Sequence, residues 1–193
     1  MWLRRRLMTA ERGREQLDRK LRILIPERQR LETRAARRHG EWAVAYAQAQ
    51  TWLLRASLLG GQDALRSASA PQLVDVTVLW TSAMGLAYPE DATVSAAGPD
   101  APVPAGNAAL GPAARAFRAA LLAGSRAAAA DEAVRRLDAE IAVTRRRMRA
   151  LDKHWLPWLR AEISALELTL EQTEHEDVMR LRRSVLRQGG GLT

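Results

Sequence analysis

The chain has 193 residues and a formal net charge of +8, with 27% charged and only 5% aromatic residues. Ala, Arg, Leu and Glu dominate, a composition typical of long helices and coiled coils and not of a thick globular core. The chain has no cysteine, which excludes a disulfide framework and a thiolate metal site. No apolar run approaches the ~20 residues that span a bilayer, and no signal peptide is recognisable. We therefore expect a soluble, cytoplasmic protein.

The N-terminal region, residues 1–66, is predicted to form one helix of a coiled coil. Its apolar residues recur at alternating spacings of four and three, which average the 3.5-residue period of a left-handed coiled coil. Only Arg14, Arg28 and Arg38 interrupt this series. About fifty residues at 1.5 Å each give a rod of roughly 75 Å. The series is Leu3, Leu7, Ala10, Leu17, Leu21, Leu24, Leu31, Ala35, Trp42, Ala45, Ala49 and Trp52.

The connecting segment, residues 67–111, has a different pattern. Gly60-Gly61 before it is interpreted as a helix end. From Val74 to Tyr88 apolar residues alternate with others on both sides of a turn near Met84-Gly85, which predicts a short β-hairpin at about 73–89. Residues 90–111 are rich in Ala, Gly and Pro, which predicts a mobile loop.

A second long helix is predicted over residues 112–188, followed by a flexible tail at 189–193. The heptad series slips register near Pro157 and again before Val178, and the glycines from Gly189 end the helix. Its seam positions are Val134, Leu137, Ile141, Thr144, Met148, Leu151, Trp155, Leu159, Ile163, Leu166, Leu170, Val178, Leu181 and Val185.

Two long helices around a compact insert predict an all-α fold, a long antiparallel two-helix left-handed coiled coil. If the helix ends match, paired residue numbers sum to roughly 186. The acidic run Glu162 to Asp177 then lies beside the basic stretch Arg12 to Arg28, and Pro26 and Pro157 share one bend. Both termini then form a basic tip, which we expect to contact acidic loops of a partner. Its residues are Arg4, Arg5, Arg6, Arg180, Arg182, Arg183 and Arg187.

Three motifs follow one another along the chain. The first helix opens with a Leu-x3-Leu-x2-Ala-x2-Gly-x3-Leu pattern around Gly13, and the predicted hairpin carries Met84-Gly85 before Tyr88-Pro89. The second helix carries Thr-Arg-Arg-Arg-Met-Arg-Ala-Leu-Asp from Thr144, then Leu-Pro-Trp-Leu around Pro157. In this order they resemble the D-subunit family of archaeal, bacterial and vacuolar-type rotary ATPases. The residues that match the family motifs in the helices are Gly13, Arg146, Arg147, Ala150, Leu151 and Pro157.

The resemblance implies a non-catalytic rotor shaft in a V-type or A-type ATPase, coupling ATP hydrolysis or synthesis to ion transport. In the family, the shaft sits inside a ring of catalytic and non-catalytic subunits A and B. It also carries the small F subunit and docks into the C/d socket subunit above the membrane ring. The resemblance implies no cofactor and no direct nucleic-acid or membrane binding; the chain would be peripheral to the membrane through the complex.

Several side chains are candidates for partner contact or for another role. A small hairpin cannot bury both Trp80 and Tyr88, so we expect these residues, with Met84 and Gly85 at the turn, to contact a partner. Trp155 and Trp158 are interpreted as coiled-coil packing around a bend, in preference to a partner pocket.

Sites for small ligands are disfavoured. Glu174-His175-Glu176-Asp177 is better interpreted as a solvated helix face than as a metal site, because adjacent helical residues point in different directions. No phosphate-binding loop or nucleophile-base arrangement is recognisable.

Two alternatives to the rotor shaft remain. One is an arginine-rich coiled coil that binds nucleic acid, which the interleaved acidic residues disfavour. The other is a generic helical scaffold or secretion-system stalk, which does not account for the hairpin.

Overall fold

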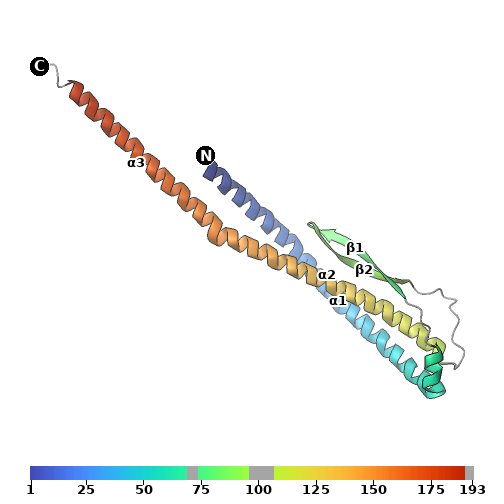
Figure 1. The fold of residues 1–193 in the computed structure, drawn as a ribbon. Coiled ribbons are helices and arrows are strands. Elements are labelled where there is room, and N and C mark those ends of the chain that lie inside the picture. The colour runs from blue at the N-terminus through green and yellow to red at the C-terminus, as the bar shows by residue number, and fades with distance from the viewer. Residues whose placement is uncertain (69–73, 96–106, 190–193) are drawn as a thin grey trace. The chain divides into compact units, whose positions relative to one another are not determined.

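The computed structural model describes residues 1–68, 74–95 and 107–189, with side chains to residue 183. It is mostly helical, with two long helical segments and one antiparallel hairpin (Figure 1), which confirms the predicted fold class. The elements in chain order are α1 (Trp2–Ala68), β1 (Asp75–Ala83), β2 (Leu86–Ser95), α2 (Leu110–Ala150), the π-helix η1 (Leu151–Trp155) and α3 (Leu156–Gly189).

The chain divides into two compact units. The terminal unit consists of residues 1–20 and 144–193, so it contains the start of α1, the end of α2, η1 and α3. The central unit consists of residues 21–143, so it contains the rest of α1, the hairpin and most of α2.

The central unit is an antiparallel helix pair that follows the predicted seam. Leu24 and Leu31 of α1 and Leu137 of α2 are almost completely buried. Arg28 donates to Asp138 at 2.9 Å, and further along α1 His39 lies 2.8 Å from Asp131. Rising numbers on α1 thus pair with falling numbers on α2, the order that an antiparallel pair requires.

The hairpin is longer than the sequence predicts and extends to Ser95 instead of ending near Pro89. Asp75 pairs with Ser95 and Ala83 with Leu86, while Met84 and Gly85 form the turn at φ values of 50° and 79°. Positive φ at both central residues is typical of the tight hairpin turn whose twist matches the strands. A bulge places Trp80 opposite Pro89 and Leu79 opposite Asp91, so Glu90 is the extra residue. The bulge changes the phase of the alternation, which explains the early predicted end.

The loop predicted at 90–111 therefore begins too early, while its predicted end lies close to the start of α2. Its first residues, up to Ser95, belong to β2, and α2 begins at Leu110. Asn107 caps this helix by accepting a hydrogen bond from the Ala109 N–H at 3.0 Å. The predicted mobility concerns residues 96–106, which lie outside the described residues, as does the predicted tail from residue 190.

Gly61 kinks α1 inside the central unit, whereas Gly60-Gly61 is interpreted from the sequence as the helix end. Its φ of 67° and ψ of −173° are not helical, and the last part of α1 continues to Ala68 beyond this kink. Asn107 donates to the Ala56 carbonyl at 3.0 Å, and Ala56 packs with Leu110 in a small apolar cluster. The start of α2 is thereby attached to the end of α1.

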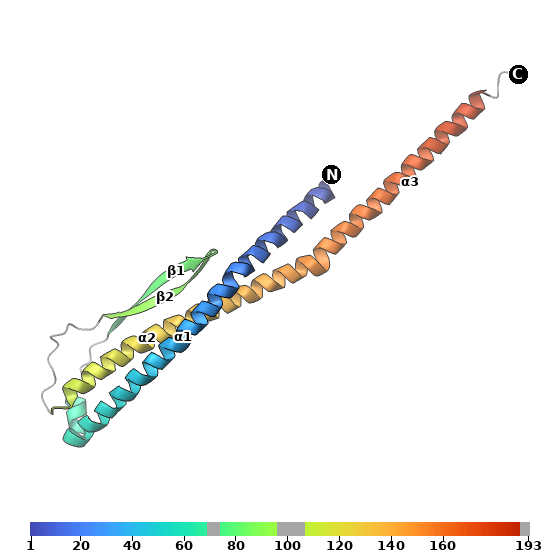
Figure 2. The same cartoon turned by 180° about the vertical axis from the view of Figure 1, so that it is seen from behind.

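The terminal unit is also an antiparallel helix pair, as the ion pairs between α1 and the later helices show. Arg4 lies 2.6 Å from Glu167, and Glu11 lies 3.0 Å from Arg160. Across both units, the residue numbers of such pairs sum to between 166 and 171. The predicted sum of roughly 186 is wrong, because α3 does not end level with the start of α1. Figures 1 and 2 both show α3 continuing beyond the N-terminal end of α1.

The predicted shared bend is wrong for the same reason. Pro157 lies next to Asp152 and Arg160, which pair with the Glu11–Arg14 region of α1. Pro26 lies two residues before Arg28, whose partner is Asp138. The two prolines therefore have different neighbours. The only residue in α1 with non-helical backbone angles is Gly61, so α1 passes through Pro26 as regular helix.

The register slip predicted near Pro157 is present and takes the form of the π-helix η1. The Leu156 N–H bonds to the Leu151 carbonyl, five residues back, so one extra residue is accommodated within the turn. The next buried residues are Leu156 and Leu159 instead of the predicted Trp155, which is 48% exposed. The seam thus steps by five residues at this one place.

Candidate partner-binding surfaces

Strand β1 carries several exposed apolar side chains, and Trp80 is one of them. The β1 residues Val76, Val78, Leu79 and Trp80 are all exposed, and Trp80 is 53% exposed. The guanidinium of Arg136 from α2 lies 4.7 Å from the centre of the Trp80 ring. This cation–π contact holds the indole near α2 and leaves about half of it accessible. Trp80 is therefore accessible in the isolated chain, and its contact with a partner stays a prediction.

Tyr88, in contrast, is not available to a partner. It is 4% exposed and packs between the helices against Leu31, Ala133 and Leu137. Its hydroxyl donates to a carboxylate oxygen of Glu27 at 2.9 Å. Burial, followed by this hydrogen bond and the nearby charge of Glu27, raises the pKa of Tyr88. The prediction that Tyr88 contacts a partner is corrected, because the hairpin docks on the helices through this ring.

The hairpin turn exposes Met84, which is 42% exposed and has a φ of 50°. A positive φ is uncommon for a residue with a side chain, so the tight turn imposes it. Gly85 follows at φ 79°, and in the described part of the chain nothing lies within 4 Å of where its Cβ would be. Both turn residues are accessible.

The arginines at the start of α1 are exposed but are not all without partners. Arg4 pairs with Glu167 of α3, and Arg6 lies 4.3 Å from the ring centre of Trp2. Arg5 is exposed, and its backbone N–H donates to the Met1 carbonyl. These contacts are on the surface, so each ion pair contributes little to stability.

The arginines near the end of α3 do not join this group. Arg180 pairs only weakly with Glu176 and Asp177 of its own helix, at 3.7 and 4.0 Å. Arg182 and Arg183 are exposed, and the side chain of Arg187 lies outside the described side chains. Since Arg4 is level with Glu167, Arg180 is 13 residues further along α3. The single basic tip is therefore not formed.

The part of α3 beyond Glu167, which we call the α3 extension (residues 168–189), continues past the N-terminal end of α1 (Figure 1). Leu170 and Val178, predicted on the seam, are 60% and 46% exposed. The acidic run is also exposed and only its start reaches α1, so it does not lie beside Arg12–Arg28 as predicted. Exposed apolar side chains within this extension are Leu168, Leu170, Val178, Met179 and Leu181.

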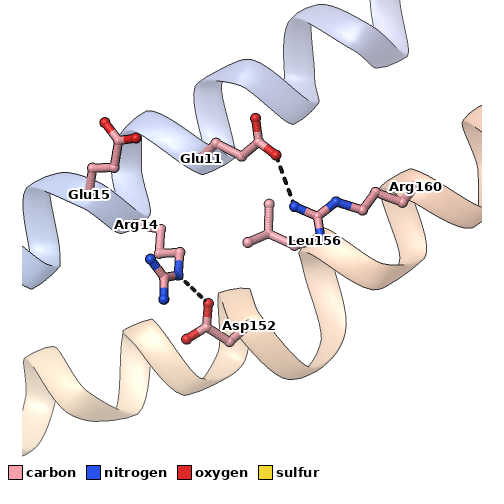
Figure 3. Close-up of a pocket in the computed structure, with 6 residues that line it drawn as sticks. All are labelled: Glu11, Arg14, Glu15, Asp152, Leu156 and Arg160. Atoms are coloured by element: carbon pink, nitrogen blue, oxygen red, sulfur yellow. Dashed lines mark hydrogen bonds and ion pairs between the residues drawn. The ribbon is translucent and has the colours of Figure 1, made fainter.

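At the level of η1 the seam is charged, as Figure 3 shows. Arg14, one of the residues that interrupt the heptads, donates to Asp152 at 2.6 Å, and Arg160 donates to Glu11 at 3.0 Å. The hydrogen bond with Asp152 and its negative charge raise the pKa of Arg14. Arg14 is recognisable from the sequence as an interruption of the heptads, but its partner Asp152 is not, because 138 residues separate the two. Leu156 lies between these two ion pairs.

Trp155 and Trp158 form an exposed pair on the terminal unit. Their ring centres are 5.6 Å apart at an angle of 88°, an edge-to-face arrangement, and the side chains are 48% and 46% exposed. The interpretation of these residues as coiled-coil packing is wrong, because Leu156 and Leu159 occupy the seam instead. Lys153 and His154 line the same hollow as the two indoles.

The residues that match family motifs have different environments. Arg146, Arg147, Ala150 and Pro157 are exposed, and Leu151 is partly buried at the start of η1. Gly13 lies in a regular part of α1, and no described atom lies within 4 Å of where its Cβ would be.

None of the helices in residues 1–68 and 107–189 combines the length and the apolar character that crossing a membrane requires.

Comparison with known proteins gives consistent results. A sequence model of the ATP synthase D-subunit family matches residues 1–184. The D subunit of a V-type ATP synthase from Thermotoga neapolitana is 30% identical over 187 residues, which cover 94% of this chain and 91% of that protein. The similarity therefore extends over both helix pairs and the hairpin.

Proposed function

Since the chain belongs to the ATP synthase D-subunit family, we propose that it is the non-catalytic central shaft of a V-type or A-type ATP synthase. In this role it transmits torque between the ATP-hydrolysing ring and the ion-translocating ring of the membrane. The observation that carries the proposal is the family match over residues 1–184, which includes both long helices and the hairpin.

The paired helices suit a shaft for a physical reason. A pair of helices has no threefold symmetry, so three catalytic sites around it each face a different side of the pair. The faces also differ chemically: the terminal unit has apolar Trp155 and Trp158 on one surface and the ion pairs of Arg14 and Arg160 at the seam. These differences allow one shaft orientation to hold three sites in three states.

The partners follow from this role. We propose that the ring of subunits A and B surrounds the terminal unit and that acidic loops of the ring meet Arg4, Arg5 and Arg6 and the arginines from Arg180 onward. The exposed hairpin surface around Trp80, Met84 and Gly85 is proposed to contact the small F subunit or the C/d socket subunit. The chain would then be cytoplasmic and reach the membrane only through the complex.

The many arginines of the chain do not require nucleic acid as a partner. Several arginines are paired with carboxylates of the chain itself; Arg28, for example, lies 2.6 Å from Glu32 and 2.9 Å from Asp138. Arginines engaged in this way are not free to neutralise phosphates.

The test is co-purification of the tagged chain from its source, with an untagged strain as the control. We expect the catalytic and non-catalytic ring subunits and a small partner to be retained, with bound ATPase activity. Recovery of the chain without ring subunits, together with salt-sensitive DNA binding at physiological ionic strength, would contradict the proposal and support the nucleic-acid alternative.

A further inference from the structure

The two indoles on the terminal unit are exposed because of one extra residue in the helix. Seam residues up to Leu151 follow spacings of four and three, and continuing those spacings would bring positions 155 and 158 to the seam. Both positions are tryptophans. The π-turn of η1 instead brings Leu156 and Leu159 to the seam, where they are 4% and 1% exposed. The turn therefore exchanges a buried tryptophan pair for a buried leucine pair.

Exposing two large aromatic side chains is unfavourable in water, because the indoles together keep a large apolar area solvated. Single-turn π-helices are found frequently at functional sites. Tryptophan is among the residue types enriched at the hot spots of protein interfaces. These two observations indicate that the surface has an occupant in the assembled state.

The surroundings of the pair carry a net positive charge. Between Arg145 and Glu162 the chain has six Arg and Lys residues against two acidic residues, Asp152 and Glu162; Asp152 is paired with Arg14, and Arg160 with Glu11. Lys153 and His154 line the hollow of about 490 Å³ that Trp155 and Trp158 form. An occupant with acidic side chains is attracted to this surface, whereas a cationic occupant is repelled.

We propose that Trp155 and Trp158 form a docking surface for an acidic segment of the surrounding ring subunits that inserts an apolar side chain between Lys153 and the indoles. This inference rests on the proposed function and adds a contact surface to it. A second copy of this chain fits less well, because a self-contact would place two basic surfaces against each other. A single-stranded nucleic acid also fits less well, because rings at 88° do not offer parallel faces to successive bases.

The absence of cysteine makes a direct test possible. The variant H154C has one thiol, located in the hollow, and its reaction with a maleimide reports access to that position. We expect fast labelling in the isolated chain and much slower labelling after reconstitution with the ring of subunits A and B. Equal labelling rates in the two states would overturn the inference. The inference would also be overturned if a single-stranded oligonucleotide, the small F subunit on its own or a high concentration of the chain itself slowed the labelling of H154C.

Binding measurements give a second test. We expect W155A/W158A to bind the ring about 30-fold more weakly or worse, the loss that corresponds to one truncated anchor residue. W155F/W158F should retain most of the binding, and K153E should weaken it most at low salt. The matched control is L58A/L59A, which removes two other apolar side chains that are 78% and 66% exposed. Melting curves of every variant establish that folding is intact, since neither indole is in the buried seam.

The outcomes separate this inference from the proposed function. If the unchanged chain does not assemble with the ring subunits, both fail. If it assembles normally and W155A/W158A binds as tightly as the unchanged chain, only the docking surface is refuted.

Discussion

Tyr88 shows how a single residue fixes the hairpin to the helices. Its ring fills the space between Leu31 and Leu137, and its hydroxyl bonds to Glu27, which is also paired with Arg30 at 2.7 Å. The pKa of Tyr88 is raised mainly because burial disfavours the phenolate, and the carboxylate of Glu27 adds to this. A raised pKa in the folded state means that the neutral phenol stabilises the fold below the usual tyrosine pKa of about 10.

We therefore predict that stability is lost as pH rises through the raised pKa of Tyr88. In the variant Y46F, Tyr88 is the only phenol, so its phenolate absorbance can be followed directly. It should ionise above pH ~10, together with loss of hairpin structure. Y88F should remove this pH dependence and lower the free energy of unfolding by about 0.5–1.5 kcal/mol, the net contribution of one hydrogen bond. Ionisation at the usual tyrosine pKa, with the hairpin intact, would show that the ring is not buried.

At the scale of secondary-structure elements, periodicity predicted the helices, the hairpin and a slip near Pro157. It did not predict the pairing register, because a heptad seam fits equally well when it is shifted by whole heptads. The register instead depends on specific pairs such as Arg14 with Asp152, which a hydrophobic pattern does not encode. The hydrophobic pattern also does not show whether Trp155 or Leu156 occupies the seam after the slip at η1, because both residues are apolar. A Pro and a bulge within β2 similarly concealed the end of the hairpin.

The corrected register leads to a prediction about Pro26 and Pro157. Each lies inside a helix and lacks a donor N–H, so P26A and P157A should each stabilise the chain, by up to about 3 kcal/mol. Because the two prolines have different neighbours, their effects on the free energy of unfolding should add within about 0.5 kcal/mol in the double variant. Urea titrations followed by circular dichroism measure the free energy of unfolding of the unchanged chain, the two single variants and the double variant. A coupling energy well above about 0.5 kcal/mol would contradict this prediction and support a bend shared by the two prolines.

At the scale of the whole molecule, the described residues bury small sets of side chains along the helix pairs instead of one large hydrophobic core. Most fully buried side chains are Ala and Leu on the helix seams, and most of the charged pairs are exposed. Such a molecule gains little stability from any segment that lacks a partner helix. The α3 extension (residues 168–189) is the clearest example, because its apolar side chains up to Leu181 are exposed in the isolated chain. Most helical stability in proteins comes from packing of an amphipathic face, and the extension lacks such packing.

We predict that the α3 extension contributes to assembly and not to the stability of the isolated chain. Backbone amides of the extension should exchange hydrogen rapidly, whereas those of residues 144–166, which face α1, should be protected. Truncation after Glu167 should change the free energy of unfolding by less than about 0.5 kcal/mol, as for a surface change, because Arg4 keeps its partner. The same truncation should weaken binding to the ring of subunits A and B, where the exposed leucines of the extension would be buried. The control is truncation after Leu159, which removes the partners of both Glu11 and Arg4 and should lower the melting temperature. If truncation after Glu167 lowers the melting temperature by as much, the extension is packed in the isolated chain and the prediction is wrong.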